Sequence, residues 1–187
     1  NCYSTDLGDI RKKTENIFNF DILDSVDTKV INIFEKYFNK KMKKVGQDIQ
    51  RWETGSFNPL HSDNTDEDGN PTPFEIIKCA AILYLDDSYS GGEFRFPEHS
   101  IDILPKKNSI LIFDSGKDNL HLSEEITSGT RTTFLTLWDY EDSNYSEERK
   151  AQWESELETI EKIKKVQQNE WNRINMLDNK NIDSGGK

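Results

Sequence analysis

Short apolar runs separated by turn residues occupy the chain between residues 74 and 140, and this pattern limits the fold more than any other feature. The runs cover 74–87, 93–97, 101–105, 109–114, 120–126 and 131–140. Glycine, proline, asparagine, aspartate and serine cluster between them, and no run of helical period interrupts the series. Closely spaced strands without intervening helices favour antiparallel neighbours. The sequence therefore predicts an all-β sandwich or barrel core.

Helical patterns and loops are expected before this core. Residues 26–44 carry apolar side chains at steps of three and four, which predicts a helix that lays one stripe on a sheet. The stripe consists of Val30, Ile33, Phe34, Tyr37, Phe38 and Met42. From Val45 the period changes, so 45–52 is expected to form a strand. Residues 62–72 are polar and rich in turn formers, which predicts an exposed loop.

After Tyr140 the chain becomes polar, and an amphipathic helical pattern returns over 141–177. Its stripe consists of Trp153, Leu157, Ile160, Ile163 and Val166. We expect this stripe to cover one face of the sheet, in preference to an oligomer contact. Residues 178–187 are expected to be a disordered tail. We thus expect one domain over 1–187, with helical support in 1–44, the β core in 45–140 and a helical segment in 141–177.

The charge balance excludes several function classes. The chain of 187 residues has 35 acidic and 24 basic side chains, a formal net charge of −11. Such a surface repels a phosphate backbone, so no nucleic-acid partner is expected. No apolar run is long enough for a membrane span, and the first residues lack the pattern of a signal peptide. We therefore expect a soluble, cytoplasmic protein without a membrane partner, either a monomer or a weak dimer.

The cysteines and the overall amino-acid usage indicate the redox compartment and the type of genome. Cys2 and Cys79 lie far apart in the chain, which argues against a disulfide framework and favours a reducing compartment. Lysine outnumbers arginine 18 to 6 and asparagine is frequent, as an AT-rich viral or microbial genome would produce.

Two of the three histidines fall in a pattern that suits a metal site. His61 and Asp63 are two positions apart, so in an extended chain both side chains point to the same side. His121 follows sixty residues later, on an expected strand. Two imidazoles and one carboxylate on one face leave the opposite positions of a metal open, the arrangement that suits a non-haem Fe(II) oxygenase. His99, between short strands, is interpreted as a turn residue and not as a ligand.

An arginine follows the last of these residues at a useful spacing. Arg131 lies ten residues after His121, so two strands joined by a tight turn would bring it back beside the metal. A planar guanidinium in a mostly apolar pocket binds a carboxylate through two parallel hydrogen bonds. The chain has six arginines, so this placement is informative.

With these residues in place, the chain resembles the 2-oxoglutarate- and Fe(II)-dependent dioxygenases, and within them the prolyl 4-hydroxylase-like branch. The similarity runs from about Ile49 to Tyr140. Its ordered pieces are WETGSFNPLHSD, AAILYLDD, GGEFRF, LIFDS, HLSEEITSGTR and LTLWDY. Each piece is loose alone, but their order and spacing together are specific. The resemblance implies a double-stranded β-helix, a distorted, cupin-like jelly roll with iron at its open mouth and helices on its flanks.

The resemblance also assigns roles to single residues. It implies that His61, Asp63 and His121 are the iron ligands and that Arg131 pairs with the distal carboxylate of 2-oxoglutarate. Tyr84 matches a tyrosine that hydrogen-bonds the same carboxylate, and Thr133 falls near the co-substrate. Further pocket positions are Trp52, Ile82 and Phe94, of which Ile82 and Phe94 are also read as plain core residues.

The implied activity is hydroxylation of an unactivated C–H bond, with release of succinate and CO2. The implied substrate is a prolyl residue of a peptide or protein, possibly proline-rich in sequence. Fe(II), 2-oxoglutarate and O2 are the implied cofactors and co-substrates, with ascorbate as reductant. Asp63 favours hydroxylation, because related halogenases have a small residue there that makes room for chloride.

Three positions depart from the family's pattern. Trp52 stands where many relatives have a tyrosine, Glu125-Ile126 replaces a frequent Pro-Val, and Arg131 replaces the lysine of collagen-type enzymes. The tryptophan at position 52 removes a hydroxyl from the pocket, so the identity of the substrate is not specified.

Two alternative functions follow. The first is the same chemistry on a free amino acid or another small substrate such as a damaged base. The second is a jelly-roll binding or structural module with a vestigial or zinc-filled site. The oxygen-bearing side chains of Asn64, Asp66, Glu67 and Asp68 are expected to belong to a solvated substrate-entry loop and not to a calcium site.

Overall fold

The computed structural model describes residues 2–6, 21–66 and 68–156, together with residues 158, 159, 162 and 165. The chain divides into two compact units, Asn1–Ser143 and Asn144–Lys187. The elements of the first unit are β1 (Cys2–Asp6), α2 (Asp21–Phe38), β2 (Met42–Glu53), β3 (Asn58–His61), β4 (Cys79–Tyr84), β5 (Ser90–Gly91), β6 (Phe94–Phe96), η1 (Pro97–His99), β7 (Ile101–Ile103), β8 (Ile110–Asp114), η2 (Lys117–Asn119), β9 (His121–Ser123), β10 (Ile126–Ser128) and β11 (Thr130–Tyr140).

The larger sheet has five strands in the order β1-β2-β11-β4-β8, and every neighbouring pair is antiparallel. Its central strand β11 is rich in threonine, apolar and aromatic residues, side chains that suit a pleated and largely buried surface. Because side chains alternate between the faces, β11 contributes to both sides of the sheet.

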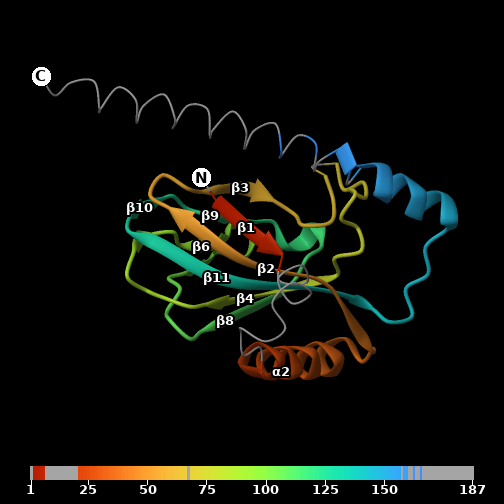
Figure 1. The fold of residues 1–187 in the computed structure, drawn as a ribbon, viewed down its shortest axis with the longest axis horizontal. Helices are drawn as coiled ribbons and strands as arrows, with labels where there is room; N and C mark the ends of the chain where they lie inside the picture. The colour runs from red at the N-terminus through yellow and green to blue at the C-terminus, as the bar shows by residue number, and fades with distance from the viewer. Residues whose placement is uncertain are drawn as a thin grey trace, which may run out of the picture. The chain divides into compact units, whose positions relative to one another are not determined.

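A smaller sheet in the order β3-β9-β6-β7 lies across from the larger one, and β5 pairs with β10 at one end. Figure 1 shows the two sheets as layers, with α2 on the other side of the larger sheet. An apolar cluster of Ala80, Phe94, Phe96 and Phe113 fills the space between the sheets. Two antiparallel sheets closed over one core form the distorted jelly roll that the sequence predicts.

Helix α2 covers the outer face of the larger sheet. Val30 and Phe34 are each 1% exposed and pack against Cys79 and Trp138. Asp21 and Asp24 lie in the first turn, where carboxylates are favourable to the helix dipole. A helix on one face of the sheet therefore protects the core from the side opposite the smaller sheet.

Two boundaries before the core differ from prediction. The helix was expected over 26–44, but it ends at Phe38, and Asn39 adopts a left-handed conformation with φ 52°. Met42 begins β2 yet stays buried in the same cluster as Phe34. Residues 2–6 form a strand paired with β2, so the helical support expected over 1–44 is wrong there.

Exposure of individual residues corrects two further expectations. Ile33 and Tyr37 in the expected stripe of α2 are 50% and 77% exposed. In the 62–72 loop, Ser62 and Asn64 are buried, because each side chain donates a hydrogen bond to a backbone carbonyl of the core. The rest of this loop is half-buried or exposed where it is described.

In the second unit, residues 147–156 are helical, as predicted. The Trp153 ring packs edge-on against Tyr145 at 4.6 Å between ring centroids. Leu157, Ile160, Ile163 and Val166 lie outside the described residues, as do Glu67 and the expected tail at 178–187. The proposed cover of the sheet by this stripe therefore stays a prediction.

Two observations bear on environment. No helix among the described residues is long and apolar enough to span a membrane. Cys79 is a buried free thiol in the core beneath α2.

Candidate metal centre

The two histidines of the candidate site face each other across paired strands. β3 and β9 are antiparallel, and His61 lies directly opposite His121 in their register. Residues opposite each other in such a pair place their side chains on the same face of the sheet. Their imidazole centroids are 4.3 Å apart. Strand pairing alone thus brings together two residues sixty positions apart.

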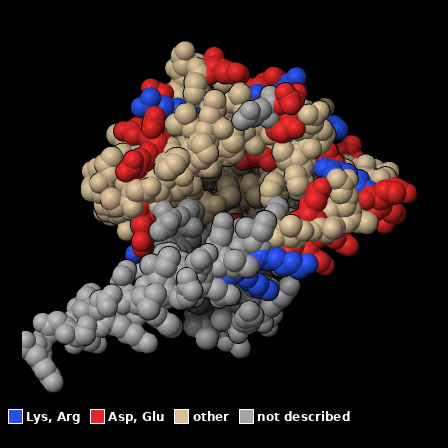
Figure 2. Space-filling view, turned by 90° about the horizontal axis from the view of Figure 1, so that it is seen from above, with Lys and Arg blue, Asp and Glu red and all other residues tan. Residues whose placement is uncertain are grey.

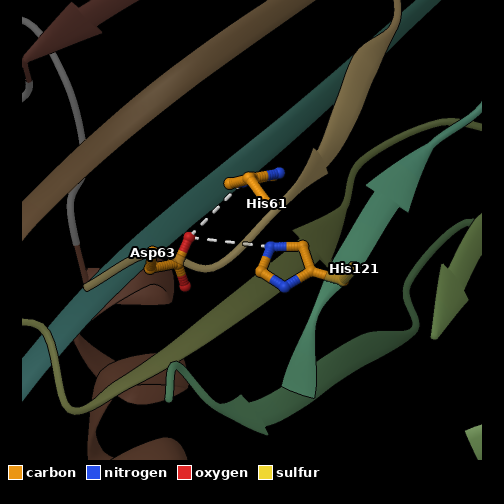
Figure 3. Close-up of side chains that lie close together, drawn as sticks. All are labelled: His61, Asp63 and His121. Carbon is orange, nitrogen blue, oxygen red and sulfur yellow. Dashed lines mark ion pairs between the residues drawn. The ribbon is translucent and has the colours of Figure 1, made fainter. Parts of the chain in front are cut away.

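Asp63 enters the site from the turn that follows β3. Its Oδ1 lies 3.7 Å from His61 Nε2 and 3.6 Å from His121 Nε2. Figure 3 shows the Asp63 carboxylate placed toward both imidazoles. On either side of Asp63, the Ser62 hydroxyl donates to the Ser115 carbonyl and the Asn64 amide donates to the Ile77 carbonyl. These two anchors fix the turn, so Asp63 does not need a regular strand to hold its position.

Backbone carbonyls orient both imidazoles. His61 Nδ1 lies 2.8 Å from the Pro59 carbonyl, and His121 Nδ1 lies 2.9 Å from the Asn119 carbonyl. A carbonyl only accepts, so each Nδ1 carries the proton and each Nε2 presents a lone pair. The Asn58 amide is 3.2 Å from His61 Nε2 and donates to it. The ring face of His121 stacks on Phe94 at 5.1 Å between centroids.

The electrostatics keep Asp63 and His61 in the forms that bind a cation. Burial acts to raise the pKa of Asp63, but interaction with His121 and His61 outweighs it and lowers that pKa below its usual value. Burial and the neighbouring His121 ring lower the pKa of His61. At neutral pH the site therefore holds one carboxylate and a neutral His61 imidazole.

The geometry and the donor set fit a divalent metal. One ligand atom from each of His61, Asp63 and His121 lies within 4.8 Å of the other two, and this is the one such cluster in the part of the chain that is described. Asp63 Oδ2 is buried and has no hydrogen-bond partner among the described residues. A buried carboxylate oxygen without a partner is costly, and a cation between the three groups would remove that cost. Two imidazoles and a carboxylate suit non-haem Fe(II).

Arg131 lies in the same cavity on the larger sheet. It is 3% exposed, and its Nη1 donates to the Gly92 carbonyl at 2.9 Å and to the Ser123 hydroxyl at 3.0 Å. In the register of β11 and β2 it lies opposite Trp52, and its guanidinium carbon is 4.5 Å from the centroid of the indole. The Gly92 carbonyl, the Ser123 hydroxyl and the Trp52 ring thus contact the guanidinium inside the cavity. Such a group can bind an anion that enters the cavity.

The strand alternation places the remaining predicted residues on the cavity wall. Tyr84 and Thr133 are each 1% exposed and lie opposite each other in β4 and β11. The cavity is lined by all nine residues singled out in the sequence, namely Trp52, His61, Asp63, Ile82, Tyr84, Phe94, His121, Arg131 and Thr133. It has a volume of about 90 Å³. That space exceeds what one water molecule needs several-fold, so the site can admit a small ligand.

Four residues of this region with polar side chains were missed in the sequence. Asn58, Ser123 and Gln50 also line the cavity. Gln50 and Ser123 are each two positions from a predicted residue, Trp52 and His121, so strand alternation would have identified them. Tyr89, whose ring centroid is 6.0 Å from the Arg131 guanidinium, lies in a loop and carries no periodic signal.

The third histidine lies apart from this cluster. His99 is the last residue of η1, and its Nε2 lies 2.7 Å from the carbonyl of Asp118 in η2. The Asp66 carboxylate accepts from the backbone N–H groups of Asp68 and Asn70, which is a local turn interaction. Neither residue contributes to the candidate metal centre.

Comparison with known proteins agrees with this geometry. Residues 48–140 match the model of the 2OG-Fe(II) oxygenase superfamily, a range that contains the three candidate ligands and Arg131. The chain is 32% identical over 106 residues to prolyl 3-hydroxylase 2 of Homo sapiens, covering 50% of this chain and 15% of that protein. It is 30% identical over 87 residues to prolyl 3-hydroxylase 1 of Gallus gallus, covering 44% of this chain and 12% of that protein. The chain thus spans less than a sixth of the length of these curated relatives.

A solved structure shares the fold. The viral collagen prolyl hydroxylase vCPH from Paramecium Bursaria Chlorella virus-1, solved as a 2OG complex, superposes with a TM-score of 0.58. The match covers 75% of this chain and 80% of that one at 17% sequence identity. At this identity the comparison shows the fold alone.

Proposed function

Residues 48–140 belong to the 2OG-Fe(II) oxygenase superfamily, and on this premise we propose that the protein is a dioxygenase that hydroxylates an unactivated C–H bond. The observation that carries the proposal is the meeting of His61, Asp63 and His121 within 4.8 Å, in one cavity with Arg131. The metal ligands and the anion-binding group arise from different sheets. Because these residues line one cavity, a metal ion and a small carboxylic acid could be bound next to each other.

His61, Asp63 and His121 would hold Fe(II) through two Nε2 atoms and a carboxylate oxygen. Three protein ligands leave open positions for co-substrate and O2. Fe(II) with 2-oxoglutarate supplies oxidising power, coupled to release of succinate and CO2. The Pro59 and Asn119 carbonyls fix the ligand tautomers, an outer contact that usually matters for metal affinity.

Arg131 would bind the distal carboxylate of 2-oxoglutarate. Trp52 supports this role, because its Nε1–H is buried and has no hydrogen-bond partner among the described residues. Trp52 stacks against Arg131, so a carboxylate held by the guanidinium could also accept from the indole. Tyr84 and Thr133 complete the polar part of the wall, while Ile82 and Phe94 supply its apolar part. An indole N–H thus replaces the hydroxyl that relatives have at this position.

The proposed substrate is a prolyl residue of a peptide or protein, with ascorbate as the reductant that keeps the iron in the Fe(II) state. The relatives named prolyl 3-hydroxylase support a prolyl substrate. Which ring carbon reacts depends on how the substrate enters, so C3 and C4 are both candidate positions.

Two measurements test this function. Purified protein with Fe(II), ascorbate and 2-oxoglutarate should release succinate, and mass spectrometry of proline-rich peptide libraries should show the gain of one oxygen atom. Oxidation of a free amino acid and not of peptides would contradict the proposed peptide substrate. The proposed hydroxylation reaction would still stand. Metal-reconstituted protein that neither binds nor decarboxylates 2-oxoglutarate would overturn the proposal.

A further inference from the structure

Asn58 contacts one of the three candidate metal ligands without belonging to the ligand set. Its side-chain amide nitrogen lies 3.2 Å from His61 Nε2. The Pro59 carbonyl holds the proton on His61 Nδ1, so Nε2 is an acceptor and the Asn58 amide donates to it. Nε2 is also the atom of His61 that lies 3.7 Å from the Asp63 carboxylate and would bind the metal. The Asn58 amide and a metal ion therefore compete for one lone pair.

A register shift in β3 explains why Asn58 lies on the cavity face. Asn58 is opposite Ser123 and His61 is opposite His121, so three steps along β3 match two steps along β9. In a regular strand, residues three positions apart point to opposite faces. One extra residue in a strand redirects a side chain, and such bulges are common beside functional sites. Asn58 and His61 both line the cavity as a result.

The residue opposite Asn58 contacts the anion-binding group of the cavity. Ser123 Oγ accepts a hydrogen bond from Arg131 Nη1 at 3.0 Å, and Ser123 lines the same cavity. Asn58 thus contacts a metal ligand and lies across the strand pair from a residue that contacts the guanidinium. A 2-oxoglutarate molecule bound by both the metal and Arg131 would pass close to this position. An amide that no longer donated to His61 could donate to one of its oxygens.

We propose that the Asn58 amide changes its acceptor when the metal binds. Without metal it donates to His61 Nε2, and with metal bound it donates to an oxygen of 2-oxoglutarate. The inference rests on the proposed function and adds a co-substrate-binding residue to the same site. Asn58 then lowers metal affinity, because its hydrogen bond to His61 must break, and raises co-substrate affinity, because the amide gains a new acceptor.

Two binding measurements on the full chain test this exchange. Asn58→Ala removes the amide and leaves the net charge unchanged. The variant should bind Co(II) about twofold to tenfold more tightly than wild type, and once loaded with Co(II) it should bind 2-oxoglutarate about twofold to tenfold more weakly, the range for one hydrogen bond. Isothermal titration under anaerobic conditions measures both affinities. Structural damage would weaken both, so the opposite signs distinguish an exchange of acceptor from damage.

Gln50→Ala is the matched control for metal affinity. Gln50 is a second carboxamide in the cavity wall, and its Oε1 accepts from the Thr133 hydroxyl at 3.4 Å. Its removal should leave Co(II) affinity unchanged. Both variants keep the formal net charge of −11, which is necessary because an acidic surface attracts cations at long range. Figure 2 shows acidic side chains around a hollow in one face of the molecule.

A spectroscopic measurement follows the amide itself. In ¹⁵N-labelled protein, the side-chain amide signals that disappear in Asn58→Ala belong to Asn58, and they should shift when diamagnetic Zn(II) is added. The signals of Gln50, assigned in the same way, should shift less. Unchanged or weaker Co(II) affinity in Asn58→Ala, or unchanged 2-oxoglutarate affinity, would overturn the exchange. Wild-type protein that binds Co(II) but not 2-oxoglutarate would overturn the proposed function, whereas the Co(II) affinities would still test the contact between Asn58 and His61.

Discussion

Asp63 is the carboxylate ligand of the candidate metal centre, and the contribution of its charge to metal affinity can be measured separately. Asp63→Asn keeps the shape of the side chain but removes the charge, so Fe(II) affinity should fall by more than the ~10- to 100-fold typical of losing an outer-shell partner. Metal binding is measured by titration with Fe(II) or Co(II) under anaerobic conditions. Asp102→Asn is the control, because that carboxylate is exposed and lies outside the cavity. Equal affinity in both variants would show that Asp63 is not a ligand.

Arg131 is predicted to act on co-substrate affinity more than on metal affinity. Arg131→Lys keeps a positive charge but loses the planar fork, so 2-oxoglutarate should bind about 10- to 100-fold more weakly, the range for charge-assisted hydrogen bonds. Isothermal titration of the metal-loaded protein measures the effect. Arg51→Lys on exposed Arg51 of β2 should leave the affinity unchanged. An unaltered affinity in Arg131→Lys would assign the distal carboxylate to another residue.

The sequence predicted the residues with distinctive chemistry better than their neighbours. His61, Asp63, His121 and Arg131 belong to residue types that are rare in the chain or stand at a recognisable spacing, and the structure brings them into one cavity. Asn58 was missed because a loop asparagine is common. Its position beside His61 depends on where β3 begins, which the sequence does not specify to one residue.

At the scale of elements, the turn before β6 determines where the guanidinium lies. Gly92 has φ 72°, and a Cβ there would lie 2.4 Å from Ile126 Cδ1 and 3.1 Å from Arg131 Nη1. Gly55 has a similar φ of 86°, but a Cβ there would meet nothing within 4 Å. The two glycines therefore share a backbone constraint and differ only in what surrounds them.

This difference gives a paired prediction. Gly92→Ala and Gly55→Ala should each lose about 1–2 kcal/mol of stability from left-handed strain, and Gly92→Ala should lose more because of the contact with Ile126. Gly92→Ala alone should weaken 2-oxoglutarate binding, because Arg131 must move. Urea unfolding and ligand titration on the same samples separate the two effects. Weaker ligand binding in Gly55→Ala as well would attribute the effect to global destabilisation.

The boundary of α2 shows why periodicity alone misplaced an element. Met42 continues the helical stripe of Phe34 and Phe38 at a step of four, so the pattern predicts one helix to 44. In the structure the chain turns at Asn39, and Met42 reaches the same core cluster from β2. A buried position can be reached from a helix or a strand, and a short apolar pattern does not distinguish them. The central strands lack this ambiguity, because turn residues bound each of them.

In the described part of the first compact unit, two apolar cores lie around the larger sheet, and the cavity adjoins the core between the sheets. Val30, Phe34 and Trp138 fill the space beneath α2, and Phe94 and Phe113 fill part of the space between the sheets. Phe94 and Phe113 also contact the His121 ring, at 5.1 and 4.7 Å between centroids. The aromatic core therefore continues into the wall of the candidate metal centre. Rigid neighbours of this kind help to keep ligand geometry fixed.

The core beneath α2 also sets how stability responds to alkaline pH. Cys79 is 0% exposed, and burial raises the pKa of its thiol above the ordinary value. Between about pH 8.5 and 9.5 the unfolded thiol loses its proton while the folded one keeps it. The folded state then binds more protons than the unfolded state, so the free energy of unfolding should fall as pH rises.

A Cys2→Ser background with and without Cys79→Ala tests this assignment. The protein that retains Cys79 should lose about 1.4 kcal/mol more than the Cys79→Ala protein on going to one pH unit above the thiol's unfolded pKa. Urea unfolding at a series of pH values from 7 to 9.5 measures the two slopes and stays below the range where tyrosines of the unfolded chain are mostly ionised. Comparing slopes and not absolute stabilities removes the cost of the small cavity that alanine leaves. Parallel slopes would mean that the thiol ionises in the folded protein, which contradicts a sealed core between α2 and the larger sheet.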